Sequence, residues 1–326
     1  MRIGIYKDTL ANKRGADVAV IALVEGLRER GHDTVLFEKA DFAKRMEDAW
    51  DVVISTGTNE LLDIYAYTAR RDFPWPVVQQ FHTNPKSQFK WKRFRRNWTI
   101  RQALRKVGAI QVLSESFVPQ VCKYGPKVAV IGNWSKHEGF TAKDAKTTGK
   151  VVIYPAAFAK GKNQKLLIKA FAKVSGEYPD WKLRLLGRAE GRYADECRLL
   201  VAKLNCRDKV EFAGYSDDMA SEYANCAFVA FPSLDEGFPL TIVDAAAFGK
   251  PTLMVKDWVA TGAEAGGVLA RPTVKSYADG LGRLMADEVL SRTIGENARK
   301  FCDREYSKEK ILDKWESLLG TVYGKQ

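Results

Sequence analysis

The chain has 326 residues, of which 46% are hydrophobic, 28% are charged and 11% are aromatic, and its formal net charge is +12. This length predicts two domains of about 150 residues, each able to bury a core, and charges of mixed sign with many aromatic residues exclude a disordered chain. No apolar run approaches the roughly 20 residues that span a bilayer, and no signal segment precedes the first strand pattern, so we expect a cytoplasmic protein.

The first part of the chain alternates short apolar runs with helix-like segments, a pattern typical of a parallel α/β fold. The runs are rich in Val and Ile, as in strands that helices cover on both faces. Strands are therefore predicted at Arg2–Tyr6, Thr34–Glu38, Val52–Ser55, Pro76–Phe81, Ala109–Leu113 and Lys127–Ile131.

The positive charge is concentrated between Phe73 and Ser114, where no acidic residue occurs. The other 284 residues together carry only +3, so the basicity is a local feature. The nine cations of this segment are Lys86, Lys90, Lys92, Arg93, Arg95, Arg96, Arg101, Arg105 and Lys106.

Aromatic residues are interleaved with these cations in a helix-like pattern. One face of the predicted helix is apolar and packs on the sheet, through Ile100, Leu104 and Val107. The opposite face forms an exposed stripe suited to an anionic bilayer or to lipid phosphates, built from Trp91, Arg95, Trp98, Arg101 and Arg105 together with Phe94. Two alternatives remain, a solvated basic helix whose aromatics are tucked into a loop, and a nucleic-acid surface, although no RNA-binding motif accompanies the segment.

A polar stretch without periodicity, residues 137–150, predicts a linker, after which the α/β pattern restarts. Strands follow at Val151–Tyr154, Lys182–Leu186, Val210–Ala213, Phe228–Phe231 and Pro251–Val255. Helices are predicted at Asn163–Ser175, Tyr193–Leu204 and Leu240–Phe248, and from Val274 to the end with breaks near Asp287 and Tyr306. We therefore expect two doubly wound domains, residues 1–140 and 141–305, with a helix 306–326 that is able to cross back to the first, and a ligand cleft between the sheets.

The five cysteines form no C-x-x-C pair and no zinc-type spacing. They are predicted to be buried, reduced and apolar: Cys122, Cys197, Cys206, Cys226 and Cys302.

The most informative segment is Phe231–Pro251, in which a strand, a tight loop with Glu236 and Gly237, and a helix beginning near Leu240 follow one another. Free N–H groups at such a helix N-terminus attract phosphate. Asp244 lies eight residues after Glu236, so that the two carboxylates can face one ligand. The alternative is an ordinary turn carrying a solvated acid.

This segment resembles the signature P-S-x-x-E-G-F-x7-E-A-x-A-x-G-x-P of the retaining glycosyltransferases of family four, the glycosyl transferases group 1. The positions that match are Pro232, Ser233, Glu236, Gly237, Phe238, Ala245, Ala247, Gly249 and Pro251. The resemblance implies the GT-B fold, two Rossmann-like domains facing each other across a cleft. It also implies that Glu236 lies by the donor sugar and that Asp244, which replaces the second Glu, binds the ribose.

Other segments extend the resemblance. The segment from Tyr154 to Phe171 is similar to the family's G-R-x4-K-N segment, which implies that Lys162 contacts the donor diphosphate. The family's Arg falls at Ala157, so one phosphate cation is missing unless Lys160 or an interdomain Arg compensates. His82 matches the strand-end His that reaches the reaction centre. The remaining implied contacts are Gly187, Tyr215, Gly237, Phe238, Leu240 and Thr241 on the donor, and Gly15 and Asn133 on the acceptor or phosphate side.

The resemblance implies a retaining hexosyltransferase that moves a sugar from a nucleotide sugar, with UDP favoured over GDP. The acceptor is a saccharide or a lipid-linked saccharide of surface polysaccharide, lipopolysaccharide or glycolipid synthesis. No metal cofactor is expected, because no D-x-D triplet occurs in the sequence. We expect no nucleic-acid partner and a peripheral location at the inner face of the cell membrane. The alternative function is a non-catalytic GT-B-like nucleotide- or sugar-binding module, which Ala157 and Asp244 favour.

Overall fold

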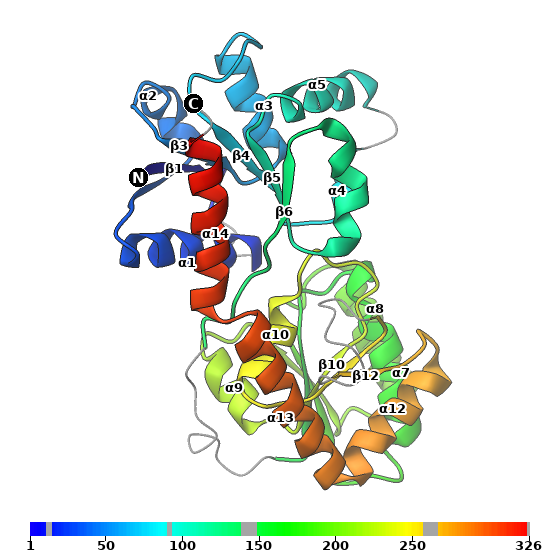
Figure 1. Cartoon of the computed structure of the whole chain (residues 1–326). Helices are drawn as coiled ribbons and strands as arrows, with labels where there is room; N and C mark the ends of the chain where they lie inside the picture. Colours follow the sequence, from blue (N-terminus) through cyan, green and yellow to red (C-terminus); the bar gives the residue numbers. More distant parts are fainter. Residues whose placement is uncertain (11–14, 90–92, 138–148, 257–266, 325–326) are drawn as a thin grey trace. The chain divides into compact units, whose positions relative to one another are not determined.

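The computed structural model describes residues 1–10, 15–89, 93–137, 149–256 and 267–324 (Figure 1). The chain divides into two compact units. Unit 1 comprises Met1–Trp134 and Lys308–Gln326, and unit 2 comprises Ser135–Ser307. Each unit is built on one parallel sheet, as the sequence predicts.

Unit 1 contains a six-stranded parallel sheet in the order β2-β1-β3-β4-β5-β6. The strand order reverses next to β1, so β1 and β3 meet at the switch point where open α/β sheets bind ligands. The strands are β1 (Arg2–Tyr6), β2 (Asp33–Phe37), β3 (Val52–Ser55), β4 (Val77–Gln80), β5 (Ala109–Val112) and β6 (Lys127–Val130). Each lies within one residue of its predicted bounds at either end.

The longer helices of unit 1 form because apolar residues recur every three or four positions and are buried. In α1 (Gly15–Glu29), for example, Val20, Leu23 and Leu27 are buried. The helices are α1 (Gly15–Glu29), α2 (Phe42–Arg45), α3 (Thr58–Tyr67), α4 (Pro85–Gln88), α5 (Phe94–Leu104) and α6 (Val118–Val121), with α14 (Lys308–Tyr323) from the end of the chain.

Helix α14 completes unit 1 by packing on α1, β3 and β4. An ideal Cβ placed on Gly26 would lie 2.8 Å from Leu312 Cδ2, so the two helices approach closely because residue 26 is a glycine. Arg30 forms ion pairs with Asp313 and Glu316, at 2.9 and 3.3 Å. The predicted C-terminal helix of residues 306–326 therefore belongs, from Lys308, to the first unit.

Unit 2 contains a six-stranded parallel sheet in the order β12-β11-β10-β7-β8-β9. Its strands are β7 (Val151–Pro155), β8 (Lys182–Leu186), β9 (Val210–Gly214), β10 (Phe228–Phe231), β11 (Thr252–Met254) and β12 (Gly267–Leu269). Its helices are α7 (Gln164–Val174), α8 (Arg192–Lys203), α9 (Met219–Asn225), α10 (Leu240–Ala247), α12 (Val274–Ala286) and α13 (Glu288–Glu305). The prediction omitted β12 and α9, because three and seven residues are too few to establish a period.

The boundary between the units lies at residue 134, six residues before the predicted position. Ser135 and His137 belong to unit 2 because both contact its residues. Ser135 Oγ donates a hydrogen bond to Asp244 Oδ1 at 2.6 Å, and the His137 ring lies 5.3 Å from the ring of Phe248. Residues 138–148 of the predicted linker fall outside the described residues.

All five cysteines are free, and four are buried as predicted. The prediction is wrong for Cys122, which is exposed. Cys122 begins a single 3₁₀ turn, Cys122–Tyr124, in which Tyr124 supplies the buried side chain and Cys122 faces outward.

Candidate active site

An ion pair in unit 2 joins the two residues that the sequence places at the centre of the site. Lys162 Nζ lies 2.5 Å from Glu236 Oε1, and Ser233 Oγ lies 2.5 Å from the same oxygen. The Glu236 side chain is only 11% exposed, whereas that of Lys162 is 32% exposed. Two donors on one oxygen fix the carboxylate in place, and the ammonium stays accessible from outside.

The loops that carry this pair are tied to one another through their backbones. Leu234 N donates to Gly161 O at 2.9 Å, and the Tyr154 hydroxyl donates to Lys162 O at 2.8 Å. Asn163 adopts a left-handed conformation (φ +57°), which ends the 3₁₀ turn Lys160–Lys162 and starts α7. Burial, and secondarily the charge of Glu236, raises the pKa of Tyr154 well above its ordinary value, so its hydroxyl remains a donor.

The N-terminus of α10 lies directly after the Glu236 loop. Its N-cap, Pro239, has no side chain that accepts from the first turn, so the amides of Leu240 and Thr241 are not capped. Thr241 Oγ1 donates to Pro155 O at 3.3 Å, which ties this end of α10 to the carboxyl end of β7. Uncapped amides at a helix N-terminus attract phosphate oxygens.

Two glycines shape the neighbouring strand ends. Gly187 follows β8 at φ +124°, and an ideal Cβ there would lie 2.3 Å from Ala156 O. Gly187 N donates to Gly214 O at 2.6 Å, so the ends of β8 and β9 are held together. Beyond Gly214, the Tyr215 ring is 56% exposed and available to a flat ligand.

Asp244 lies one turn into α10 and contacts Ser135 rather than Glu236. Burial raises the pKa of Asp244 to about 6, although the hydrogen bond from Ser135 opposes the shift. Its role as a ribose acceptor stays a prediction.

Phe238 is buried and packs edge-to-face on Tyr306, with ring centroids 5.2 Å apart. This contact gives Phe238 a packing role beside Gly237 in the loop. The family's Arg position is taken by Ala157, whose carbonyl accepts from Gln164 Nε2 at 2.9 Å. Lys160, the cation expected to compensate, is exposed.

In unit 1, His82 lies two residues beyond the end of β4. Its Nε2 is buried without a hydrogen-bond partner among the described residues. Burial, and secondarily the charge of Lys7, lowers the pKa of His82 to about 3, so the ring is neutral at pH 7. A neutral imidazole with an unused nitrogen can hydrogen-bond a hydroxyl of a ligand.

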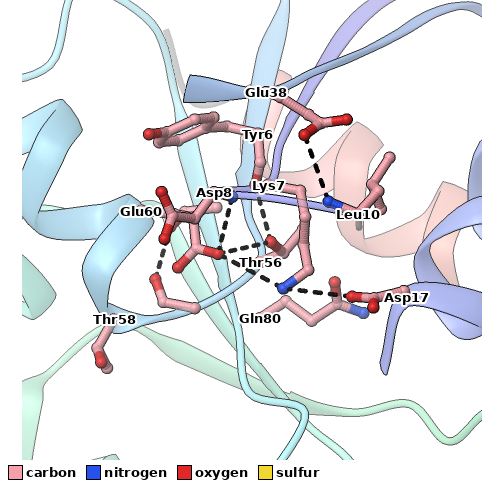
Figure 2. Close-up of polar contacts among 12 residues, drawn as sticks. Tyr6, Lys7, Asp8, Leu10, Asp17, Glu38, Thr56, Thr58, Glu60 and Gln80 are labelled. Atoms are coloured by element: carbon pink, nitrogen blue, oxygen red, sulfur yellow. Dashed lines mark hydrogen bonds and ion pairs between the residues drawn. The ribbon is translucent and has the colours of Figure 1, made fainter. Parts of the chain in front are cut away.

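A buried ionic cluster lies at the carboxyl ends of β1, β3 and β4, and sequence reasoning missed it. Lys7 Nζ lies 3.7 Å from Asp17 Oδ1 and 3.6 Å from Glu60 Oε1 (Figure 2). Glu60 Oε1 also accepts from Asp8 N at 3.1 Å, and Gln80 lies beside Lys7 in the same view. The feature of the sequence that could have indicated this cluster is Lys7, which directly follows the first strand at the switch point of the sheet.

Gly15 and Asn133, the residues predicted on the acceptor or phosphate side, both lie in unit 1, and their role stays a prediction. Gly15 is the first residue of α1 and is exposed, and residues 11–14 of its loop fall outside the described residues. Asn133 is partly buried after β6, beside the buried Trp134.

The basic segment forms α5 with the predicted division of faces. Phe94 is 79% exposed and Trp98 is 58% exposed, whereas Ile100 and Leu104 are fully buried. Arg95, Arg101 and Arg105 are exposed on the same helix and its C-cap. Trp91 lies outside the described residues. Among the residues described, no helix is long and apolar enough to cross a bilayer.

The second half of the chain matches a known family. Residues 135–301 match the family described as glycosyl transferases group 1. The chain is 35% identical over 204 residues to an exopolysaccharide phosphotransferase of Streptomyces coelicolor, covering 60% of this chain and 21% of that protein. It is 25% identical over 332 residues to the lipopolysaccharide core biosynthesis glycosyltransferase LpsE of Rhizobium meliloti, covering 94% and 96% of the two chains.

For five of the curated relatives, including the Streptomyces protein, the chain spans only between 21% and 51% of the relative's length. Among solved structures it is similar to Anabaena HepE in complex with UDP and glucose, with a TM-score of 0.82 and 19% identity over 98% of this chain and 100% of that one. The fold is therefore the predicted GT-B fold. With a family match that covers half of its length, the chain belongs to the glycosyl transferases group 1 family.

Proposed function

We propose that the protein is a retaining glycosyltransferase that uses a UDP-sugar and no metal ion. The observation that carries this proposal is the Lys162–Glu236 pair beside the uncapped N-terminus of α10. This arrangement offers a cation and backbone N–H donors for a diphosphate, and a fixed carboxylate for the hydroxyls of a sugar. The similarity to a structure that holds UDP and glucose supports UDP as the nucleotide.

In the proposed reaction, the bond between the anomeric carbon and the diphosphate oxygen breaks, and the acceptor oxygen bonds to the same face of that carbon. The acceptor proton passes to the departing phosphate oxygen, so the products are a glycoside and UDP. Lys162 and the amides of Leu240 and Thr241 stabilise the charge that develops on the diphosphate. Glu236 orients the sugar, and Asp244 accepts hydrogen bonds from the ribose.

The acceptor is proposed to be a saccharide, lipid-linked or free, of surface polysaccharide or lipopolysaccharide synthesis. The similarity to LpsE along nearly the whole chain supports this class of acceptor. Unit 1 offers the neutral His82 for an acceptor hydroxyl, because its Nε2 is unpartnered among the described groups.

A first test is a thermal-shift series with UDP, GDP and their sugars, followed by NMR of the anomeric configuration of any product. We expect a larger shift with UDP than with GDP, retention of configuration, and activity that persists in EDTA. Inversion of configuration would exclude the retaining mechanism, and the loss of activity in EDTA would exclude the metal-free one.

We further propose that α5 contacts the inner face of the cell membrane. Phe94 and Trp98 present exposed rings, and Arg95 lies between them in sequence for anionic head groups. Sedimentation with phosphatidylglycerol vesicles is expected to fall with salt and in the triple variant Phe94→Ser, Arg95→Glu and Trp98→Ser. Leu199→Ser is the matched control, because it removes an equally exposed apolar side chain from unit 2. Equal sedimentation of the triple variant would contradict the proposal.

The second candidate is a binding module without turnover, and Ala157 in place of the family's Arg favours it. A protein that binds the nucleotide but neither transfers the sugar nor hydrolyses the nucleotide sugar would be such a binding module. Ala157→Arg separates the two candidates further, since a gain in rate shows a site that is catalytic but lacks one cation.

A further inference from the structure

A cavity lies in unit 1, and its described lining includes none of the residues assigned to the proposed donor site. Its volume is about 410 Å³, within the range of about 300–1,000 Å³ in which proteins bind small ligands. The segments after β4 and β5 and one face of α5 line it. Its lining residues are Lys86, Phe89, Arg101, Ser116, Pro119, Gln120, Lys123 and Tyr124.

The floor of this cavity is aromatic. The rings of Phe89 and Tyr124 stack with centroids 5.9 Å apart, and Tyr124 is buried. The Arg101 guanidinium lies 5.9 Å from the centre of the Phe89 ring. Burial raises the pKa of Tyr124, and the charges of Arg101 and Arg105 oppose that rise.

The described residues of the lining include three cations and no acid. Among the residues that the structure describes, no carboxylate forms an ion pair with Lys86, Arg101 or Lys123. The nearest acid in sequence to any lining residue, Glu115, is not part of the lining. Three cations around one space repel one another, and an anion that enters it relieves that repulsion.

The polar groups of the lining are ordered by the fold. Gln120 Oε1 accepts from Lys86 N at 3.0 Å, which joins α4 to α6 across the cavity. Asn84 Oδ1 accepts from the same amide at 3.1 Å and caps α4. These bonds hold the Lys86 backbone against the α6 side, so the fold fixes this part of the cavity wall.

We propose that this cavity binds a phosphate or diphosphate ester of the acceptor. The three cations bind the phosphate oxygens, and the Phe89–Tyr124 floor contacts the sugar or prenyl group attached to them. This inference rests on the proposed transferase function, because it assigns the phosphate to the acceptor.

The test is isothermal titration with inorganic pyrophosphate, glucose 1-phosphate and farnesyl diphosphate. We expect the double variant Arg101→Gln with Lys123→Gln to weaken binding of each by about tenfold or more, because it removes two of the three cations that bind the phosphate oxygens. Arg93→Gln is the matched control, since it removes an exposed cation that does not line the cavity. Tighter binding of farnesyl diphosphate than of glucose 1-phosphate identifies a lipid source, and the reverse order identifies a soluble sugar phosphate.

Equal affinities of the wild type and the double variant, or no binding of any of the three probes, would overturn the inference. Every titration is repeated in Lys162→Met, in which binding at the cavity is expected to persist. UDP binding by the wild type is measured in parallel. A wild type that binds UDP but no acceptor phosphate contradicts this inference alone, whereas a wild type that does not bind UDP contradicts the proposed function.

Discussion

At the residue scale, the site is defined by which groups share an oxygen. Glu236 Oε1 accepts from both Lys162 and Ser233, so a diphosphate that binds Lys162 competes with a carboxylate that is already held. The motif predicted both residues but not their ion pair, since 74 positions separate them in the chain. It also gave no indication of the Lys7 cluster, whose members come from three separate parts of unit 1.

Substitution of Lys162 by Met tests the diphosphate contact. We expect UDP affinity to fall by roughly 10-fold to 100-fold, the equivalent of one charge-assisted hydrogen bond of about 1.5–3 kcal/mol. Lys165→Met is the control, because Lys165 lies on α7 close by but pairs with Glu196 at 2.6 Å. Titration calorimetry with UDP measures both. An unchanged affinity of Lys162→Met would remove Lys162 from the site.

The proposed contact of Asp244 with the ribose predicts that UDP binding depends on pH with a definite sign. Its pKa is raised to about 6, so the carboxylate is ionised above that pH and becomes protonated below it. An ionised Asp244 accepts hydrogen bonds from ribose hydroxyls better than a protonated one. UDP affinity is therefore expected to fall as the pH drops from 7 to 5, and Asp244→Asn should lose this dependence.

The same shift affects folding stability in the opposite direction. The pKa of Asp244 in the folded protein lies above the ordinary value of 3.8, so the folded state binds this proton more tightly than the unfolded state does. The protonated carboxyl therefore adds to the free energy of unfolding at low pH, and this contribution is lost as the pH rises from 3.8 through about 6. Asp244→Asn should therefore leave unit 2 at least as stable as the wild type at pH 7 by urea denaturation. A large loss of stability would instead indicate a structural role for the carboxylate.

At the scale of the elements, periodicity predicted the strands closely, because buried parallel strands read as short Val- and Ile-rich runs. It could not place the functional ends of the strands, which depend on backbone conformation. Gly187 illustrates the difference. Its positive φ and its approach to Ala156 arise from the pairing of β7 with β8, which the sequence of either strand alone does not reveal.

Gly187→Ala is expected to destabilise unit 2 by about 1–3 kcal/mol, because alanine is strained at φ +124° and its Cβ meets Ala156 O. Gly176→Ala is a matched control, since nothing lies within 4 Å of its ideal Cβ and its φ is not positive. Urea denaturation of both variants gives the comparison. Equal stabilities would show that the loop between β8 and α8 rearranges without cost.

At the scale of the whole molecule, the restart of the α/β pattern near residue 150 predicted two units. The break near Tyr306 predicted a separate last helix. Its place in unit 1 depends on Gly26 and Leu312, which are 286 residues apart and meet only in three dimensions. Sequence spacing carries no signal for such a contact.

Leu312→Ala tests how far unit 1 depends on α14. Leu312 is buried, and its truncation is expected to cost about 2–5 kcal/mol in unit 1. Glu309→Ala, on the exposed face of α14, should change stability by less than about 0.5 kcal/mol. Limited proteolysis of Leu312→Ala should cleave unit 1 first while UDP binding by unit 2 persists. If cleavage of unit 1 and the loss of UDP binding by unit 2 occurred at the same time, the two units would unfold together.

The return of α14 to unit 1 also sets the order in which the two units are completed during synthesis. Unit 2 is one continuous stretch, Ser135–Ser307, whereas unit 1 needs Lys308–Tyr323 to cover α1. On the ribosome, domains usually fold in the order in which they are made. Here the face of α1 around Gly26 stays uncovered until unit 2 has emerged, because Leu312, which packs against Gly26, follows the last residue of unit 2 in the chain.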